Sequence, residues 1–277
     1  MKILHINSYY SAGSFYKNLY DKQKENGLNI DVYVPVSTSV DTSSLKLGDY
    51  TTISVNHGKY DRLFFHLKHI KKYTITDYTL IHAHSLFSNG YIALKLKKKY
   101  GKPYVVAVRN TDVNTFMRYM IHLRKLGVQI IKEAEKVIFL SETYRNRVVE
   151  KYIPADLKKE VFNKTAIIPN GIDNFWLENK PCRIEGVKNN SINIIFAGQI
   201  SKNKNVSTTI KACEILLKKG YNVKFAVVGR VKDQTEYQVI KTRDFVNYVE
   251  HQPKEKLIDL YRENDIFVMP SKNETFG

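Results

Sequence analysis

Cysteine is scarce in this chain, whose 277 residues include only Cys182 and Cys213. These two form no C-x-x-C pair and no Cys/His quartet accompanies them, so no disulfide framework and no structural zinc are expected. Long apolar runs are also lacking: the longest, 104–108 and 194–197, are strand-sized, whereas a membrane-spanning helix needs about 18 apolar residues. The first ten residues lack the apolar core of a secretory signal. We therefore expect a cytoplasmic protein.

Acidic residues are in short supply relative to basic ones. The chain carries 44 Lys/Arg against 27 Asp/Glu, and the first 190 residues alone carry 30 against 17. Such an excess draws a protein toward anionic partners, among them phosphorylated substrates, acidic lipid surfaces and nucleic acids. A Lys-rich overall composition accounts for part of it. Because no nucleic-acid-binding motif accompanies the charge, we expect no nucleic-acid partner.

Residues 62–72 form a basic amphipathic pattern. Four apolar residues share one helical face: Leu63, Phe64, Leu67 and Ile70. Such a helix could attach the protein to the anionic inner face of a membrane, because each basic residue near the surface contributes about 1 kcal/mol. The alternative, which we favour, is an ordinary helix that covers a sheet and keeps its charges in water.

Short apolar strands alternate with helical patterns along the first part of the chain. We predict strands at 2–7, 28–35, 80–83, 103–108, 137–140 and 165–169, with helices at 15–26 and 90–100. This alternation is typical of an α/β domain in which helices cover both faces of a parallel sheet.

A second series of the same kind follows a polar stretch. We predict strands at 192–197, 223–228, 245–249 and 266–269, and helices at 206–219 and 254–263. A doubly wound domain needs roughly five or six strands, so the second domain is predicted to be incomplete. The predicted organisation is a first Rossmann-like domain at 1–170, a linker at 171–191 and a partial second Rossmann-like domain at 192–277.

The most specific stretch is 196–205, FAGQISKNKN, in which a strand, a glycine turn and lysines precede a helix. Backbone N–H groups and the positive end of a helix favour phosphate, and a lysine adds a mobile positive charge. The pattern therefore indicates an anion site. The alternative is an ordinary strand-to-helix loop with solvated lysines.

Three further motifs surround this stretch in order: PNGID at 169–173, VVG at 227–229 and PSKNETFG at 270–277. Together the four resemble the retaining glycosyltransferases of family 4, which have the GT-B fold, and the resemblance covers essentially the whole chain. It implies two Rossmann-like domains facing across a cleft, a nucleotide-sugar donor held mainly by the second, and a saccharide or lipid-linked saccharide acceptor. It also implies retention of anomeric configuration without a metal or other cofactor, and the chain has no Asp-x-Asp motif to carry a metal to a pyrophosphate.

The resemblance assigns catalytic roles to Lys204 and Glu274. Lys204 matches the lysine that contacts the donor pyrophosphate, and Glu274 matches the first carboxylate of the family's E-x7-E pattern, which faces the donor sugar. Thr275, Phe276 and Gly277 would offer N–H groups to the phosphates. The second glutamate would lie beyond Gly277, so the chain is expected to be truncated inside its second domain, and an inactive fragment or donor-binding remnant is the alternative function.

Two further positions differ from the family pattern. Gln199 stands where the family has an arginine, so it can donate hydrogen bonds but brings no charge. Lys202 is expected to substitute for that charge in part.

In the first domain, Gly13 permits close approach of a ligand to the loop after the first strand. Arg109-Asn110-Thr111-Asp112 stands where the family commonly has His-Gly-x-Asp, so only Asp112 matches. Arg109 predicts either an acidic or phosphorylated group of the substrate nearby or a salt bridge to Asp112, and we favour the salt bridge.

Two histidines accompany a predicted strand. His84 stands where the family often has a histidine that lines the cleft, although a hydrogen-bonded structural role fits equally well. In His82-Ala83-His84 we expect the alternation along the strand to place the two rings on opposite faces, where they cannot bind one metal together.

Overall fold

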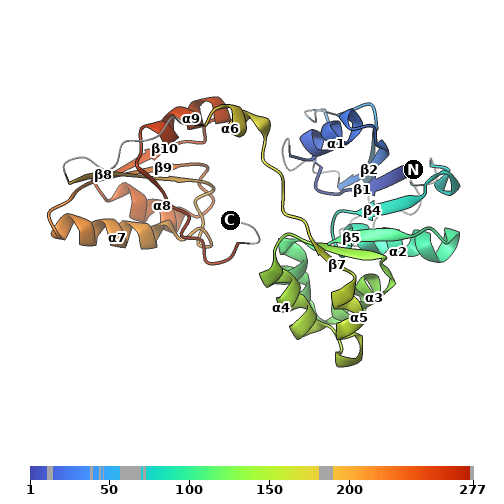
Figure 1. Ribbon diagram of the computed structural model, residues 1–277. Coiled ribbons are helices and arrows are strands. Elements are labelled where there is room, and N and C mark those ends of the chain that lie inside the picture. The colour runs from blue at the N-terminus through green and yellow to red at the C-terminus, as the bar shows by residue number, and fades with distance from the viewer. Residues whose placement is uncertain are drawn as a thin grey trace. The chain divides into compact units, whose positions relative to one another are not determined.

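The computed structural model describes residues 1–10, 15–37, 40–43, 45, 47–56, 70, 73–180 and 190–274. The chain folds into two compact units, one spanning Met1–Asp173 and the other beginning at Asn174 (Figure 1). Each unit contains a parallel sheet with helices packed on it. The predicted α/β class with two Rossmann-like sheets is therefore confirmed.

The sheet of the first unit has seven parallel strands in the order β3-β2-β1-β4-β5-β6-β7. Their bounds are β1 Lys2–Ile6, β2 Asn29–Ser37, β3 Thr51–Asn56, β4 Leu80–Ala83, β5 Tyr104–Ala107, β6 Lys136–Phe139 and β7 Thr165–Ile167. The chain winds outward from β1 to β3 and then returns to the other side of β1 with β4. The boundary between β1 and β4 is thus the topological switch point, where open α/β sheets bind ligands beyond the carboxyl ends of their strands.

Helices cover both faces of this sheet. Their bounds are α1 Phe15–Glu25, α2 Ser88–Tyr100, α3 Arg124–Glu133, α4 Glu142–Tyr152 and α5 Lys158–Asn163. The unit also contains a π-helix, η3 Asp112–Met117, and the short 3-10 helices η2 Ile75–Asp77, η4 Ile121–Leu123 and η5 Ala155–Leu157. Tyr20 of α1 belongs to the same core cluster as Ile3, while Ile92 of α2 belongs to the cluster that contains Leu4. Because successive residues of a strand point to opposite faces, α1 and α2 lie on opposite faces.

The second unit has four parallel strands in the order β10-β9-β8-β11. The strands are β8 Ser191–Ala197, β9 Asn222–Val228, β10 Val246–Val249 and β11 Ile266–Phe267, and the helices are α6 Asn174–Glu178, α7 Val206–Lys218, α8 Gln234–Lys241 and α9 Lys254–Arg262. Helices α7 and α8 lie on one face and α9 on the other (Figure 1). Phe196 and Phe225 are fully buried at its centre.

Strand β11 forms one edge of this second sheet, and its side chains are open to solvent. Ile266 is 42% and Phe267 49% exposed. Beside them, Trp176, Ile258 and Tyr261 line an apolar hollow of about 400 Å³. With β11, the described part of the second unit contains the four strands that the sequence predicts.

Several predicted segments fall partly outside the described residues. Helix α6 lies within the predicted linker 171–191, of which 181–189 are outside them. Of the predicted basic helix at 62–72 only Ile70 is described, and it is buried. Among the described helices, none combines the length and apolar character that crossing a membrane requires.

Candidate active site

The loop between β8 and α7 carries the predicted anion-binding lysine, and two backbone contacts fix its course. The Gly198 N–H donates to the Val228 carbonyl oxygen at 2.8 Å and the Ile200 N–H to that of Arg230 at 2.9 Å. Gly229 has a φ of 150°, and a Cβ there would lie 1.9 Å from the Gly198 carbonyl oxygen. The two loops can therefore approach this closely only with glycine at 229.

A second set of contacts ties this loop to the segment after β11. The Lys272 N–H donates to the Asn203 carbonyl oxygen at 2.8 Å, and the Asn203 side chain donates to the Asn273 carbonyl oxygen at 3.0 Å. The Asn205 side chain donates to the Pro270 carbonyl oxygen at 3.1 Å. Since β9 and β10 lie on the other side of β8, this junction is the switch point of the second sheet, and it brings the two predicted catalytic segments together.

Lys204 and Glu274 meet at this junction and form an ion pair. Lys204 Nζ lies 2.6 Å from Glu274 Oε1 and 3.8 Å from Met269 Sδ, and the two charged side chains are 24% and 28% exposed. We call Lys204, Glu274 and the first turn of α7 the lysine site. Asn205 precedes α7 in the left-handed conformation, with a φ of 55°, and its side chain does not cap the helix. Both the ammonium and the open helix end favour an anion.

Gln199 and Lys202 lie elsewhere on the same loop. Gln199 is exposed. Lys202 Nζ is 4.0 Å from an oxygen of Asp233, whose carboxylate also accepts hydrogen bonds from the first N–H groups of α8. The ammonium of Lys202 thus lies near the carboxylate of Asp233 in the loop before α8. That Lys202 replaces the charge of the missing arginine stays a prediction.

Asp112, predicted to bind substrate, is buried and accepts three backbone hydrogen bonds. The N–H groups of Leu86, Phe87 and Arg109 donate to its oxygens at 2.9, 3.3 and 2.8 Å. Burial raises the pKa of this carboxyl from 3.8 to about 6, although the three hydrogen bonds and the charge of Arg109 act in the opposite direction. Asp112 therefore holds two loops at the carboxyl ends of β4 and β5. Its predicted contact with a substrate stays a prediction.

The guanidinium of Arg109 makes different contacts from those we favoured. Its Nε donates to the carbonyl oxygen of His84 at 3.1 Å and its Nη1 to Asn170 at 3.4 Å. Asp112 is reached only by the backbone N–H of Arg109. The favoured salt bridge was wrong, because the buried carboxylate is already surrounded by N–H groups. The guanidinium instead forms hydrogen bonds to the loops after β4 and β7.

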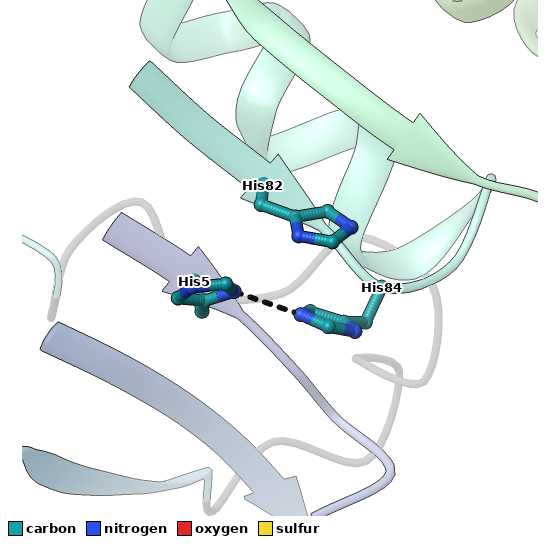
Figure 2. Close-up of side chains that lie close together, drawn as sticks. All are labelled: His5, His82 and His84. Atoms are coloured by element: carbon teal, nitrogen blue, oxygen red, sulfur yellow. Dashed lines mark hydrogen bonds between the residues drawn. The ribbon is translucent and has the colours of Figure 1, made fainter. Parts of the chain in front are cut away.

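His82 and His84 lie on the same face of the first sheet, together with His5 (Figure 2). The centroids of the His82 and His84 rings are 4.1 Å apart and stacked. Our expectation of opposite faces was wrong, because residues two apart along a strand share a face and only Ala83 points the other way. His5 of β1 stands opposite His82 of β4 in the strand register. We call these three residues the histidine cluster.

The histidine cluster is uncharged at neutral pH. His5 Nδ1 and His84 Nε2 are hydrogen-bonded at 2.9 Å. Burial lowers the pKa of His5 and of His84 well below 6.5 and that of His82 to about 3, with the neighbouring rings and Arg109 contributing less. His84, the predicted substrate-binding histidine, is thus engaged in a buried contact with a neighbouring ring.

Four predicted substrate-binding residues lie outside the described residues: Gly13, Thr275, Phe276 and Gly277.

Two family models cover almost the whole sequence. The model described as Glycosyltransferase Family 4 matches residues 12–174, which is more than half of the chain, and the model described as Glycosyl transferases group 1 matches residues 182–277. The chain belongs to glycosyltransferase family 4. The resemblance inferred from the four motifs is therefore confirmed.

Curated relatives of this family 4 chain are distant. It is 26% identical over 202 residues to the capsular polysaccharide biosynthesis glycosyltransferase CapM of Staphylococcus aureus, covering 68% of this chain and 50% of that protein. It is also 26% identical over 219 residues to a D-inositol 3-phosphate glycosyltransferase of Paenarthrobacter aurescens, covering 72% of this chain and 52% of that protein. The chain spans about half the length of these relatives.

Solved structures share the fold. Sucrose-phosphate synthase of Thermosynechococcus elongatus superposes with a TM-score of 0.67 at 15% identity, covering 100% of this chain and 77% of that one. Anabaena HepE, solved with UDP and glucose, has a TM-score of 0.64 at 15% identity, covering 100% and 76%. At such low identity these structures show the fold alone, and it is the predicted GT-B type.

Two buried polar residues of the family 4 chain were not among the predicted site residues. His5 interrupts an otherwise apolar strand, which was the one signal available in the sequence. Asn7 follows the same strand, and its side chain donates to the Tyr20 hydroxyl and accepts from the Tyr9 N–H, both at 2.9 Å. Both lie at the carboxyl end of β1, beside the first switch point.

Proposed function

We propose that this chain binds a nucleotide-sugar donor at the lysine site and transfers its sugar, with retention and without a metal, to a saccharide or lipid-linked saccharide. One observation carries the proposal. A lysine ammonium, a carboxylate and an open helix N-terminus converge at the switch point of the second sheet. Family membership and the UDP in the Anabaena HepE structure support the same donor class.

Lys204 is the group best placed to bind a diphosphate. Its side chain is about three-quarters buried, and its ammonium is paired only with Glu274 among the charged side chains of the described residues. A hydrogen bond to a charged group contributes about 1.5–3 kcal/mol. Two anionic phosphates would compete with one carboxylate for this ammonium, and the N–H groups of the first turn of α7 would add further donors.

In the proposed reaction, Lys204 stabilises the departing nucleoside diphosphate. The bond between the anomeric carbon and the diphosphate oxygen breaks, and the acceptor hydroxyl oxygen bonds to the same face of that carbon. The hydroxyl proton passes to the departing diphosphate, so charge and atoms balance. Glu274 would then orient the hydroxyls of the donor sugar once its ammonium partner has turned to the phosphate.

The first test measures binding of UDP, ADP and GDP by calorimetry. Lys204→Met should weaken binding of the preferred nucleotide roughly 10- to 150-fold, because it removes a charged hydrogen bond of about 1.5–3 kcal/mol. Lys218→Met, at an exposed position at the carboxyl end of α7, is the control and should change the affinity by less than about threefold. Equal affinities for wild type and Lys204→Met would refute the role of the lysine site.

The second test asks for turnover. Nucleotide sugars of different bases are incubated with saccharide acceptors in the presence of EDTA, and release of the nucleoside diphosphate and the anomer of the product are followed by NMR. Transfer with retention supports the full proposal. Binding that depends on Lys204 but yields no release would instead support the alternative of a donor-binding remnant.

The remaining partners stay predictions. A cytoplasmic location is one of them. Attachment to an anionic membrane surface is another, and salt-sensitive binding to vesicles that contain acidic lipids would support it. Nucleic acid is not an expected partner, and binding of single or double strands that survives moderate salt would contradict this.

A further inference from the structure

The histidine cluster lies at a place where α/β sheets bind ligands. His5 is the penultimate residue of β1, and His82 is the penultimate residue of β4. These strands are the two that flank the topological switch point of the first sheet. The register pairs His5 with His82, and His84 follows two residues later on the same face. The backbone therefore fixes all three side chains in one place.

His5 and His84 turn a ring nitrogen toward each other, and the His82 ring is stacked on that of His84 (Figure 2). One ring nitrogen of each histidine lies within 4.8 Å of those of the other two, and His5 Nδ1 is only 2.9 Å from His84 Nε2. In a tetrahedral zinc site with metal–nitrogen bonds of 2.0–2.1 Å, ligand nitrogens are about 3.3 Å apart. The longest distance therefore exceeds this spacing by at most about 1.5 Å. Since His5 and His84 are already in contact, the His82 ring would have to turn to close that gap.

Each ring also has one nitrogen without a partner, which in His5 and His84 is the nitrogen opposite their mutual hydrogen bond. His5 Nε2, His82 Nε2 and His84 Nδ1 are buried and have no hydrogen-bond partner within the described structure. A buried polar nitrogen without a partner is uncommon in folded proteins and calls for an explanation. His5 and His84 are each 1% exposed, whereas His82 is partly exposed although its Nε2 is buried.

The donor set selects the kind of cation. Three neutral imidazoles suit zinc and its neighbours in the first transition row, whereas magnesium and calcium require oxygen ligands. The positive charge of Arg109, close to the backbone of His84, opposes a cation and is expected to moderate its affinity.

We propose that His5, His82 and His84 form a site for a late first-row divalent cation, Zn²⁺ being the expected one, with a fourth position open to water or a ligand oxygen. The site belongs to the first unit. It shares no residue with the lysine site, so each proposal can fail without the other.

The test uses the full 277-residue chain without a polyhistidine tag, treated with chelator and then titrated with Co²⁺. We expect one equivalent to bind and to produce the intense visible absorption of a four- or five-coordinate Co²⁺ centre, which Zn²⁺ then displaces. X-ray absorption of the zinc form should show three imidazole ligands. Absence of a stoichiometric Co²⁺ signal would overturn the proposal.

Variants locate the site. His82→Ala and His84→Ala should each lower the Zn²⁺ affinity at least tenfold, as loss of one of three ligands requires. His122→Ala replaces an exposed histidine of the same unit and should bind like wild type. His82→Gln keeps a polar group at the most exposed of the three positions, and circular dichroism without metal shows whether each variant is folded. Folded His82 and His84 variants that bind like wild type would refute the assignment.

Discussion

The lysine site and the histidine cluster occupy equivalent places in their sheets but are built in opposite ways. Each lies at a topological switch point, one beside β8 and β11, the other between β1 and β4. The lysine site consists of two opposite charges, each about a quarter exposed, on loops. The histidine cluster consists of uncharged rings on strands, two of them 1% exposed. A switch point therefore sets where a ligand binds, and the local sequence sets what it can be.

The difference also concerns how each place is held together. The loops of the lysine site are joined by backbone contacts that need a glycine at 229, whereas the loops beside the histidine cluster are held by the buried carboxylate of Asp112. Breaking these two supports should have effects of different kinds. A side chain at 229 fills the space between the two loops, whereas replacing Asp112 by an amide removes a titrating group.

The largest effect is expected for Gly229→Ala. The new Cβ would lie 1.9 Å from the Gly198 carbonyl oxygen, at a φ of 150° that side chains rarely adopt. Strain and overlap together should lower the free energy of unfolding of the second unit by about 3 kcal/mol. Trp176, the one tryptophan of the chain, lies in that unit and reports its urea unfolding by fluorescence.

Gly171→Ala is the control for this prediction, since a Cβ at 171 meets no atom within 4 Å. Its unfolding midpoint should stay close to that of wild type. If Gly229→Ala unfolds at the wild-type urea concentration, the close approach of the loops does not limit the stability of the unit.

An effect of at most similar size, dependent on pH, is expected for Asp112→Asn. The folded carboxyl has a pKa of about 6 against 3.8 in the reference state. Between these values the folded carboxyl holds a proton that the unfolded one has released, so the contribution of Asp112 to stability falls by up to about 3 kcal/mol as pH rises from about 4 to 6. The histidine cluster acts in the opposite direction, because burial lowers the pKa of its rings and the unfolded chain binds more protons there. Asp112→Asn cannot titrate, so its stability relative to that of wild type should rise by that amount between pH 4 and 6.

Urea unfolding at pH 4, 5, 6 and 7 measures the difference. Asp156→Asn, at an exposed position of the same unit, should keep the wild-type pH dependence. A stability difference between Asp112→Asn and wild type that stays constant from pH 4 to 6 would contradict the raised pKa of Asp112.

The sequence predicts the bounds of the strongly patterned elements within a few residues. It misses elements in which polar residues or a glycine interrupt the expected pattern. The misses include β3, which reads TTISVN and lies at the edge of its sheet, where polar residues are tolerated. Helix α3 contains Gly127, a residue that weakens helices in isolation. Its place there is decided by packing, because a Cβ at 127 would meet Met117 and Phe87 at 2.8 and 3.0 Å.

The sequence predicts the lysine site better than the histidine cluster, because the first is built from contiguous motifs on loops and the second from the pairing of two strands. Lys204 and Glu274 belong to motifs that are contiguous in sequence, so both were named and both lie in one place. The histidine cluster depends on the pairing of β1 with β4, since His5 and His82 are 77 residues apart. No local pattern reports that register, and the face assigned to His82 and His84 was wrong.

The smallest change in stability, with a measurable change in binding, is expected for Glu274→Gln. A partly exposed ion pair contributes about 0.2–1 kcal/mol, so its loss should lower the stability of the second unit by less than about 1 kcal/mol. The same substitution frees Lys204 Nζ, which lies 2.6 Å from Glu274 Oε1. Binding of UDP, which lacks the sugar that Glu274 is predicted to orient, should therefore tighten about two- to fivefold. Glu214→Gln breaks the ion pair with Arg243 in the same unit and should leave UDP binding unchanged. Weaker UDP binding by Glu274→Gln would mean that the carboxylate holds Lys204 in position for the diphosphate rather than competing with it.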